Sequence, residues 1–259
     1  MKLSIITVNF NNAAGLQKTI ESVVNQSFTD YEYIIIDGGS SDESVDIIQQ
    51  YADKITYWVS EPDKGIYHAM NKGILQAKGE YCQFLNSGDW FIDRFGLQYV
   101  FDKKPAESII YCDIQFGKRA LTYDDRLTFL YFFDNTIPHQ SAFIRRSLFS
   151  ILGFYNEENK IVSDWEFYMK AIINSQCSYQ HIPYLLVFYD DNGLSETNRD
   201  LLFQEREKVL RKNYPLMYDD YKQLISLKQE NQLYRNSRLI QFIHKIQRSN
   251  SYIKIREIF

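Results

Sequence analysis

The first 90 residues alternate short apolar runs with stretches of helical spacing, and this alternation limits the chain to a small set of folds. Four runs rich in β-branched and aromatic residues are predicted to be buried strands: Leu3–Val8, Tyr33–Ile36, Ile55–Val59 and Tyr81–Leu85. Three intervening stretches carry apolar residues at helical spacing: Leu16–Gln26, Val45–Tyr51 and Tyr67–Ala77. The pattern predicts an α/β fold, with a mostly parallel sheet flanked by helices.

Polar residues and glycines gather where each predicted strand ends. The four ends are Val8–Asn11, Asp37–Ser40, Ser60–Lys64 and Asn86–Asp89. In open α/β sheets, ligands bind outside the carboxyl ends of the strands. We therefore expect a ligand site along this edge of the sheet.

The regular alternation fades from about residue 105. The later elements are predicted to be strands and helices at Ile109–Ile114, Ser141–Ile144, Asp164–Ile173, Tyr184–Tyr189 and Asp200–Asn213. After Pro215 the chain is predicted to be helical and basic. We expect residues 1–105 to form a ligand-binding half, residues 106–213 the second half of the same domain, and residues 214–259 a helical extension.

Composition excludes several classes of protein. A net charge of −4 and a pI near 5.6 do not suit a nucleic-acid-binding protein. The three cysteines are odd in number and lack metal-ligand spacing, so no disulfide framework is expected. No run approaches the roughly 20 apolar residues of a membrane span, and the N-terminal apolar run is too short for a signal peptide. We expect a cytoplasmic protein.

Carboxylates occur in three places where they could do chemistry, and each has a purely structural alternative. Asp37 either caps the turn that follows its strand or binds a nucleobase or ribose. Asp89, in Asn86-Ser87-Gly88-Asp89, either belongs to a polar turn or holds Mg²⁺ or Mn²⁺ against phosphates. Asp164 and Glu166 either stabilise the dipole of a helix that begins there, or one of them is a general base.

The order of these segments resembles family 2 of the inverting glycosyltransferases, which have the GT-A fold. The resemblance covers about residues 1–195. Its matching segments are Ile5–Asn11, Tyr33–Asp42, Ser60–Tyr67, Ala69–Gly73, Gly79–Glu80, Phe84–Asp89, Pro138–Ser141 and Asp164–Glu166. Each segment is weak by itself, whereas the order and spacing together are specific.

The resemblance implies a role for each matching position. Donor-binding residues would be Val8, Phe10, Asn11, Asp37, Asp63, Lys64, Asn71, Asn86 and Ser87. Asp37 would hold the nucleobase, most often uracil, and Asp63 would lie near the ribose and phosphates. Asp89 would hold the divalent cation, and Asp164 would be the catalytic base. The acceptor side would include His139, Gln140, Trp165 and Glu166.

Two departures from the family pattern bear on this assignment. The family often has acidic residues at the positions of Asn86 and Gly88, so we expect weaker metal binding by Asp89 alone. Ser163 stands where an acidic residue often precedes the base, which changes the electrostatic surroundings of Asp164. Neither departure removes Asp89 or Asp164.

Residues 232–259 combine six basic residues with an apolar side at helical spacing. One interpretation is a terminal helix that packs on the domain or on the second copy of a homodimer. The other is a basic amphipathic helix on an anionic membrane surface, where lipid-linked acceptors are found.

The resemblance implies an enzyme that moves a sugar from a nucleoside diphosphate sugar, most often a UDP-sugar, to a hydroxyl of a glycan or lipid-linked acceptor, in bacterial surface-polysaccharide assembly. A nucleotide-sugar-binding protein without turnover is the alternative. A sugar-phosphate nucleotidyltransferase is disfavoured because Asn9–Gly15 has one glycine and no basic residue. The Gly-x-Gly-x-x-Gly sequence of a dinucleotide dehydrogenase is absent after the first strand.

Overall fold

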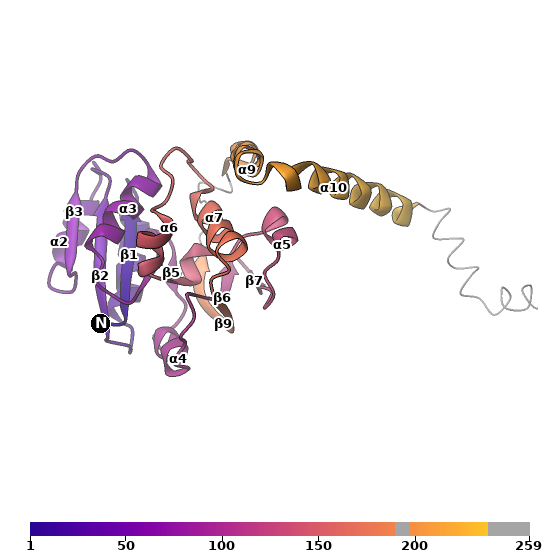
Figure 1. Ribbon diagram of the computed structural model, residues 1–259. Helices are drawn as coiled ribbons and strands as arrows, with labels where there is room; N and C mark the ends of the chain where they lie inside the picture. The colour runs from indigo at the N-terminus through magenta and orange to yellow at the C-terminus, as the bar shows by residue number, and fades with distance from the viewer. Residues whose placement is uncertain (190–196, 238–259) are drawn as a thin grey trace, which may run out of the picture. The chain divides into compact units, whose positions relative to one another are not determined.

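A computed structural model describes residues 1–189 and 197–237 (Figure 1). In this part of the chain nine strands form one sheet, in the order β3-β2-β1-β4-β8-β6-β9-β5, with β7 paired to β6. The strands are β1 (Leu3–Asn9), β2 (Tyr31–Asp37), β3 (Tyr57–Ser60), β4 (Tyr81–Phe84), β5 (Trp90–Phe91), β6 (Ile109–Phe116), β7 (Arg119–Leu121), β8 (Ala142–Arg145) and β9 (Tyr179–Tyr189).

The helices include one π-helical and one 3-10 segment. They are α1 (Ala13–Val24), α2 (Ser44–Gln50), α3 (Ile66–Gln76), α4 (Gly96–Asp102), α5 (Phe129–Asp134), the 3-10 turn η1 (His139–Ser141), α6 (Ser147–Leu152), α7 (Ser163–Tyr168), the π-helix η2 (Met169–Asn174), α9 (Arg199–Asn213) and α10 (Pro215–Asn236). None of the helices in the described residues is both long and apolar enough to cross a membrane.

The predicted α/β architecture is confirmed. β3, β2, β1 and β4 are parallel neighbours, as the alternation in the first 90 residues predicted. In the second half β8 runs antiparallel to β4 and to β6, so the sheet is mixed there. The short elements β5, β7, α4, α5 and α6 were not predicted, because two to seven residues give too little periodicity to recognise.

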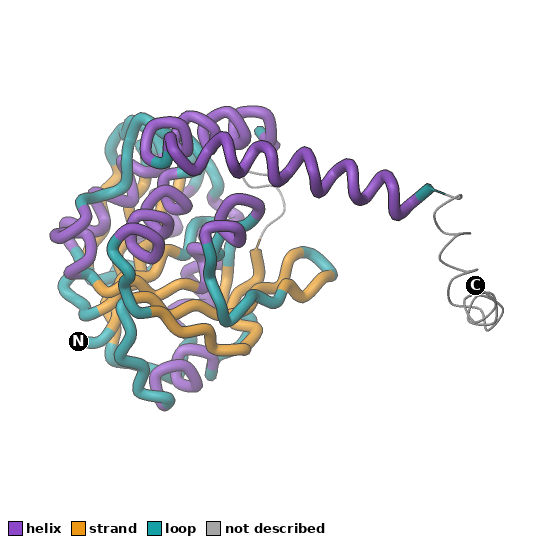
Figure 2. Tube along the Cα trace, turned by 45° about the vertical axis from the view of Figure 1, so that its right-hand side comes forward, coloured by secondary structure: helices purple, strands orange, loops and turns teal. Residues whose placement is uncertain are grey.

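Helices cover both faces of the sheet because side chains alternate along each strand (Figure 2). Leu3 and Ile5 of β1 belong to one buried cluster with Leu16 and Ile20 of α1. Ile6, on the opposite face of β1, lies under α3, where a Cβ built on Gly73 would be only 2.4 Å from its Cγ2 atom. The absence of a side chain at Gly73 lets α3 lie directly on the strand that leads into the site.

The described chain divides into two compact units. The first spans Met1–Glu205 and holds the whole sheet, to which both of the predicted segments 1–105 and 106–213 contribute strands, whereas residues 206–213 fall in the second unit. The second begins at Arg206, within α9, and includes α10. Residues 238–259, which carry most of the predicted membrane-binding or dimer-forming segment, lie outside the described residues.

Candidate active site

The predicted edge of the sheet carries a cavity of about 790 Å³, a size suited to a small-molecule ligand. Residues at the carboxyl ends of the first four strands line it: Val8, Asn9, Phe10, Asn12, Gly38, Asp63, Asn86, Ser87 and Asp89. These positions are far apart in sequence and meet because β3, β2, β1 and β4 are adjacent and parallel. The second half of the domain contributes His139, Gln140, Lys160, Ile161 and Tyr189.

The turn after β4 is fixed to the start of α1 by side-chain hydrogen bonds. The Thr19 hydroxyl accepts from the Gly88 amide at 3.0 Å and donates to the Asp89 carbonyl at 2.7 Å. The Asn12 side chain donates to the Ser87 carbonyl at 3.1 Å. Gly88 has a φ of +102°, which a glycine adopts without strain. The turn therefore holds Asp89 at the cavity wall, with 4% of its surface exposed.

Asp89 is the residue in this cavity predicted to hold a divalent cation. Among the described residues, no three or more His, Cys, Asp or Glu side chains are placed to hold a metal together. A single carboxylate is nevertheless compatible with Mg²⁺, which often takes one or two protein carboxylates and completes its shell with substrate phosphates and water. The Asp89 carboxylate therefore suits a cation that binds together with the diphosphate of a substrate.

His139 and Asp164 form a hydrogen-bonded pair at the other side of the cavity. Nδ1 of His139 lies 3.0 Å from Oδ2 of Asp164, and Nε2 lies 3.1 Å from the side-chain nitrogen of Asn86. An amide nitrogen can only donate, so in this arrangement Nε2 is the acceptor and Nδ1 carries the ring proton toward the carboxylate. His139 lines the cavity, whereas Asp164 reaches it through the imidazole.

Tyr67, the second residue of α3, supports Asp164 from inside the protein. Its hydroxyl lies 2.8 Å from Oδ1 of Asp164, and burial together with the Asp164 charge raises the pKa of Tyr67 well above its ordinary value. Burial alone would raise the pKa of Asp164, but the interaction with His139 and the hydrogen bond from Tyr67 outweigh it and lower that pKa. Asp164 is therefore an ionised carboxylate at neutral pH.

Asp37 is placed differently from its predicted role on the nucleobase. It is fully buried, and both carboxylate oxygens accept hydrogen bonds. Oδ1 accepts from the side chains of Asn9 (2.7 Å) and Ser40 (2.6 Å). Oδ2 accepts from the Ser60 hydroxyl (2.6 Å) and from the Gly39 and Ser40 amides. In this structure the carboxylate joins the ends of β1, β2 and β3 to one another, and its contact with a nucleobase stays a prediction.

Four other predicted site residues, Asn71, Glu166, Trp165 and Asn11, are hydrogen-bonded or packed within the protein. Asn71 is paired with the backbone of Tyr155, and Glu166 accepts from the Asn159 side chain at 2.7 Å. Trp165 is a core residue, 1% exposed. Asn11, at a φ of +49°, accepts from the Ser41 amide. The Lys64 side chain is exposed.

Two parts of the site were not predicted from the sequence. Tyr67 was expected as the first residue of a helix and as the last residue of the matching segment Ser60–Tyr67, without a role in the site. Lys160 and Ile161 reach the cavity because the Glu205 carboxylate accepts from both of their amides, at 2.8 and 2.9 Å. A contact between residues more than 40 positions apart leaves no local signal in the sequence.

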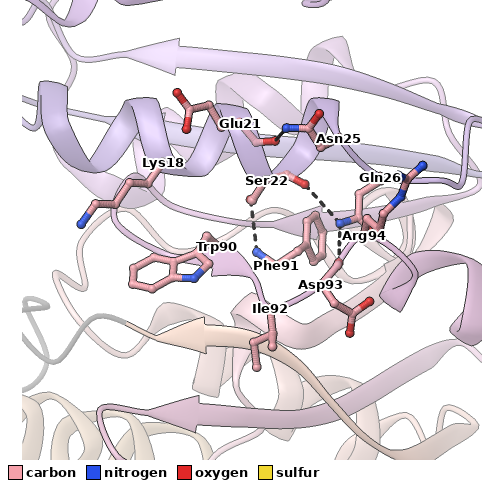
Figure 3. A pocket seen from close by; sticks show the side chains of 10 residues that line it. All are labelled: Lys18, Glu21, Ser22, Asn25, Gln26, Trp90, Phe91, Ile92, Asp93 and Arg94. Atoms are coloured by element: carbon pink, nitrogen blue, oxygen red, sulfur yellow. Dashed lines mark hydrogen bonds between the residues drawn. The ribbon is translucent and has the colours of Figure 1, made fainter.

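A second, more open hollow of about 390 Å³ lies between α1 and the segment 90–94 (Figure 3). Two of its polar side chains are hydrogen-bonded within the protein: Gln26 donates to the carbonyls of Ser22 and Asp93, and the Ser22 hydroxyl accepts from the Phe91 amide. Eight of the predicted site residues line the larger cavity instead: Val8, Phe10, Asp63, Asn86, Ser87, Asp89, His139 and Gln140.

Solved structures share this fold. Residues 1–349 of TarS from S. aureus in complex with UDP-GlcNAc match with a TM-score of 0.67 and 18% identity, over 93% of this chain and 75% of that one. The mannosyltransferase PcManGT from Pyrobaculum calidifontis, in complex with GDP-Man and Mn²⁺, matches with a TM-score of 0.62 and 15% identity, over 82% and 63%. The sheet and its covering helices are those of the GT-A fold of glycosyltransferases.

Sequence comparison then gives the family. The model for glycosyl transferase family 2 matches residues 4–100. An uncharacterized glycosyltransferase of Mycobacterium tuberculosis is 31% identical over 229 residues, covering 82% of this chain and 85% of the relative. The PGL/p-HBAD biosynthesis glycosyltransferase of Mycobacterium bovis is 29% identical over 216 residues, covering 78% and 82%. The chain belongs to glycosyltransferase family 2.

Proposed function

We propose that this glycosyltransferase moves a sugar, with inversion, from a nucleoside diphosphate sugar to a hydroxyl of a glycan or lipid-linked acceptor. One observation carries the proposal. The His139–Asp164 pair faces the same cavity as the strand-end residues that suit a nucleotide. The complexes of TarS with UDP-GlcNAc and of PcManGT with GDP-Man support the donor class.

The donor diphosphate would lie against the turn after β4, beside Asp89. Asp89 would hold Mg²⁺ or Mn²⁺, and the Mn²⁺ in the PcManGT complex supports this choice of ion. Such a cation, when bound, neutralises charge on the departing diphosphate. The exposed ring of Phe10 offers a flat apolar surface for the nucleobase.

The acceptor hydroxyl would approach from the side of His139. Nε2 of His139 takes its proton in place of the hydrogen bond that the Asn86 side chain donates to it in this structure, and the oxygen attacks the anomeric carbon from the side opposite the diphosphate. The bond from the anomeric carbon to the diphosphate oxygen breaks, and its electron pair leaves with the diphosphate. Asp164 keeps the imidazole in the tautomer that accepts at Nε2 and stabilises the cation that forms.

The family resemblance assigns the base role to Asp164 itself. Two observations support His139 as the group that receives the proton. His139 lines the cavity, and its Nε2 atom accepts from the Asn86 side chain, which lines the cavity too, whereas the Asp164 carboxylate is bonded on one side to His139 and on the other to the buried Tyr67. The lowered pKa of Asp164 also makes it a weak base.

Thermal-shift measurements with UDP-glucose, UDP-galactose, UDP-GlcNAc and GDP-mannose, each with Mn²⁺, test donor binding. The donor that stabilises the protein is then tested for slow hydrolysis, in which water is the acceptor. Stabilisation without turnover would favour a binding protein, and no stabilisation by any of the four would contradict the proposed donor class.

Asp164→Asn should lower the rate of donor hydrolysis by about 10²- to 10⁴-fold, because the amide cannot stabilise a protonated His139. The thermal shift with the donor should stay as in wild type, since Asp164 lies behind the acceptor side. Asp53→Asn, at an exposed carboxylate paired with Lys54, is the matched control and should leave turnover unchanged. Equal turnover in wild type and Asp164→Asn would contradict the assignment.

A further inference from the structure

Asp63 lines the cavity, at the point where a side chain of Gly38 would be. A Cβ built on Gly38 would be 2.8 Å from Oδ2 of Asp63. The loop after β3 therefore folds its carboxylate onto the bare backbone at the end of β2. Oδ1 of Asp63 is used within this loop, because it accepts from the Gly65 amide at 2.9 Å. Oδ2 has no hydrogen-bond partner among the described residues, so it is available to a ligand.

Phe10 approaches the same point from the end of β1. Its Cδ2 atom lies 3.2 Å from the built Cβ of Gly38, and 65% of the residue is exposed. An aromatic face and a carboxylate oxygen thus meet above Gly38, and both line the cavity. A flat heterocycle stacked on the Phe10 ring would bring its edge to Asp63.

We propose that Asp63 reads the nucleobase of the donor, its Oδ2 atom accepting the N3–H of a uracil ring that stacks on Phe10. This inference rests on the proposed nucleotide-sugar donor. It transfers the nucleobase contact from Asp37, whose oxygens are occupied at the strand ends, to an acid that the family resemblance assigns to the ribose and phosphates.

The chemistry of a carboxylate favours uracil over the other bases. An ionised carboxylate only accepts hydrogen bonds, so the base edge that faces it must present an N–H. Uracil presents one, at N3, and Asp63 has one free oxygen. Guanine presents two donors side by side, which suit a carboxylate with both oxygens free. Cytosine has a bare acceptor at N3, which a carboxylate repels.

Isothermal titration calorimetry with UDP, CDP, GDP and N3-methyl-UDP, each with Mg²⁺, tests the proposal. Wild type should bind UDP at least about tenfold more tightly than CDP or N3-methyl-UDP. N3-methyl-UDP has no N–H on that edge and leaves a charged acceptor unpaired, and CDP places the bare N3 acceptor of cytosine against the carboxylate. In Asp63→Asn the preference for UDP over CDP should fall by at least about tenfold, since an amide can donate to the bare N3 of cytosine. Asn keeps an oxygen for the Gly65 amide, so the loop is expected to fold.

Glu61→Gln is the matched control. Glu61 belongs to the same loop, but its carboxylate is paired with Lys72 at 2.8 Å, and the wild-type ratio of UDP to CDP affinity should persist. An unchanged ratio in Asp63→Asn, or equal binding of UDP and N3-methyl-UDP by wild type, would overturn the role of Asp63. The measurement on wild type stands even if the variant does not fold. Binding of none of the nucleotides, GDP included, would instead count against the proposed function.

Discussion

The carboxylate of Asp37 accepts hydrogen bonds from four neighbouring residues and has no exposed surface. Replacing it with Asn would turn an amide NH₂ toward groups that also donate. We expect Asp37→Asn to lower the free energy of unfolding at pH 7 by about 2 to 3 kcal/mol, from lost bonds to a charged acceptor and donors left unpaired. Urea unfolding followed by circular dichroism measures the difference, and a change below about 0.5 kcal/mol, a roughly neutral surface value, would contradict it.

The same carboxylate makes the free energy of unfolding depend on pH. Burial alone would raise the pKa of Asp37, but the bonds from Ser40, Ser60 and Asn9 outweigh it, so the pKa is lowered in the folded state. Its contribution is therefore present above the unfolded pKa of about 3.9 and is lost as the pH falls through the lower folded value. The difference between wild type and Asp37→Asn should narrow below about pH 4.

His139 offers a test by chemical rescue. His139→Ala should lower donor hydrolysis by about 10²- to 10⁴-fold, because the imidazole that receives the proton is removed. Added imidazole can occupy the space beside Asp164 and should restore part of the rate, with saturation at high concentration. His68→Ala is the control: this histidine contacts the Lys64 amide outside the cavity lining, so its loss should leave the rate unchanged. Full activity in His139→Ala would contradict the role of His139 as the base.

At the scale of elements, the contact between α3 and β1 positions the site, because α3 brings Tyr67 to Asp164. A methyl group at Gly73 would press on Ile6, and we expect Gly73→Ala to destabilise the fold by about 1 to 3 kcal/mol. In an Ile6→Ala background the methyl group has room, so the same substitution should cost less than half as much. Denaturant unfolding of the four proteins measures the coupling, and simple additivity would contradict it.

At the scale of the whole molecule, the sequence after Asn236 is rich in basic residues, and we propose that it attaches the enzyme to an anionic membrane surface. Each basic residue near such a surface contributes about 1 kcal/mol. The full chain should co-sediment with vesicles that contain phosphatidylglycerol, and not with vesicles of phosphatidylcholine alone. Deleting residues 232–259 should abolish co-sedimentation while donor hydrolysis persists. Unchanged vesicle binding after the deletion would disprove the attachment.

The strand ends were predictable because a parallel sheet brings them together by its topology. Alternating apolar runs identified β1 to β4, and this order alone places Val8, Phe10, Asp63 and Asp89 on one edge. The direction in which a side chain points was not predictable in this way. Asp37 and Asp63 both follow strands, and only their neighbours decide that the first is saturated and the second keeps a free oxygen.

The sequence by itself determined the α/β architecture, the edge of the sheet that carries the site, and the resemblance to family 2 glycosyltransferases. These follow from periodicity and short motifs, which are local properties of the chain. The tertiary structure decided that His139 stands between Asp164 and the cavity, that Tyr67 supports the pair, and that Asp63 takes the place of a side chain at Gly38. Each of these contacts joins residues 25 or more positions apart, and packing alone brings such residues within hydrogen-bonding or van der Waals distance.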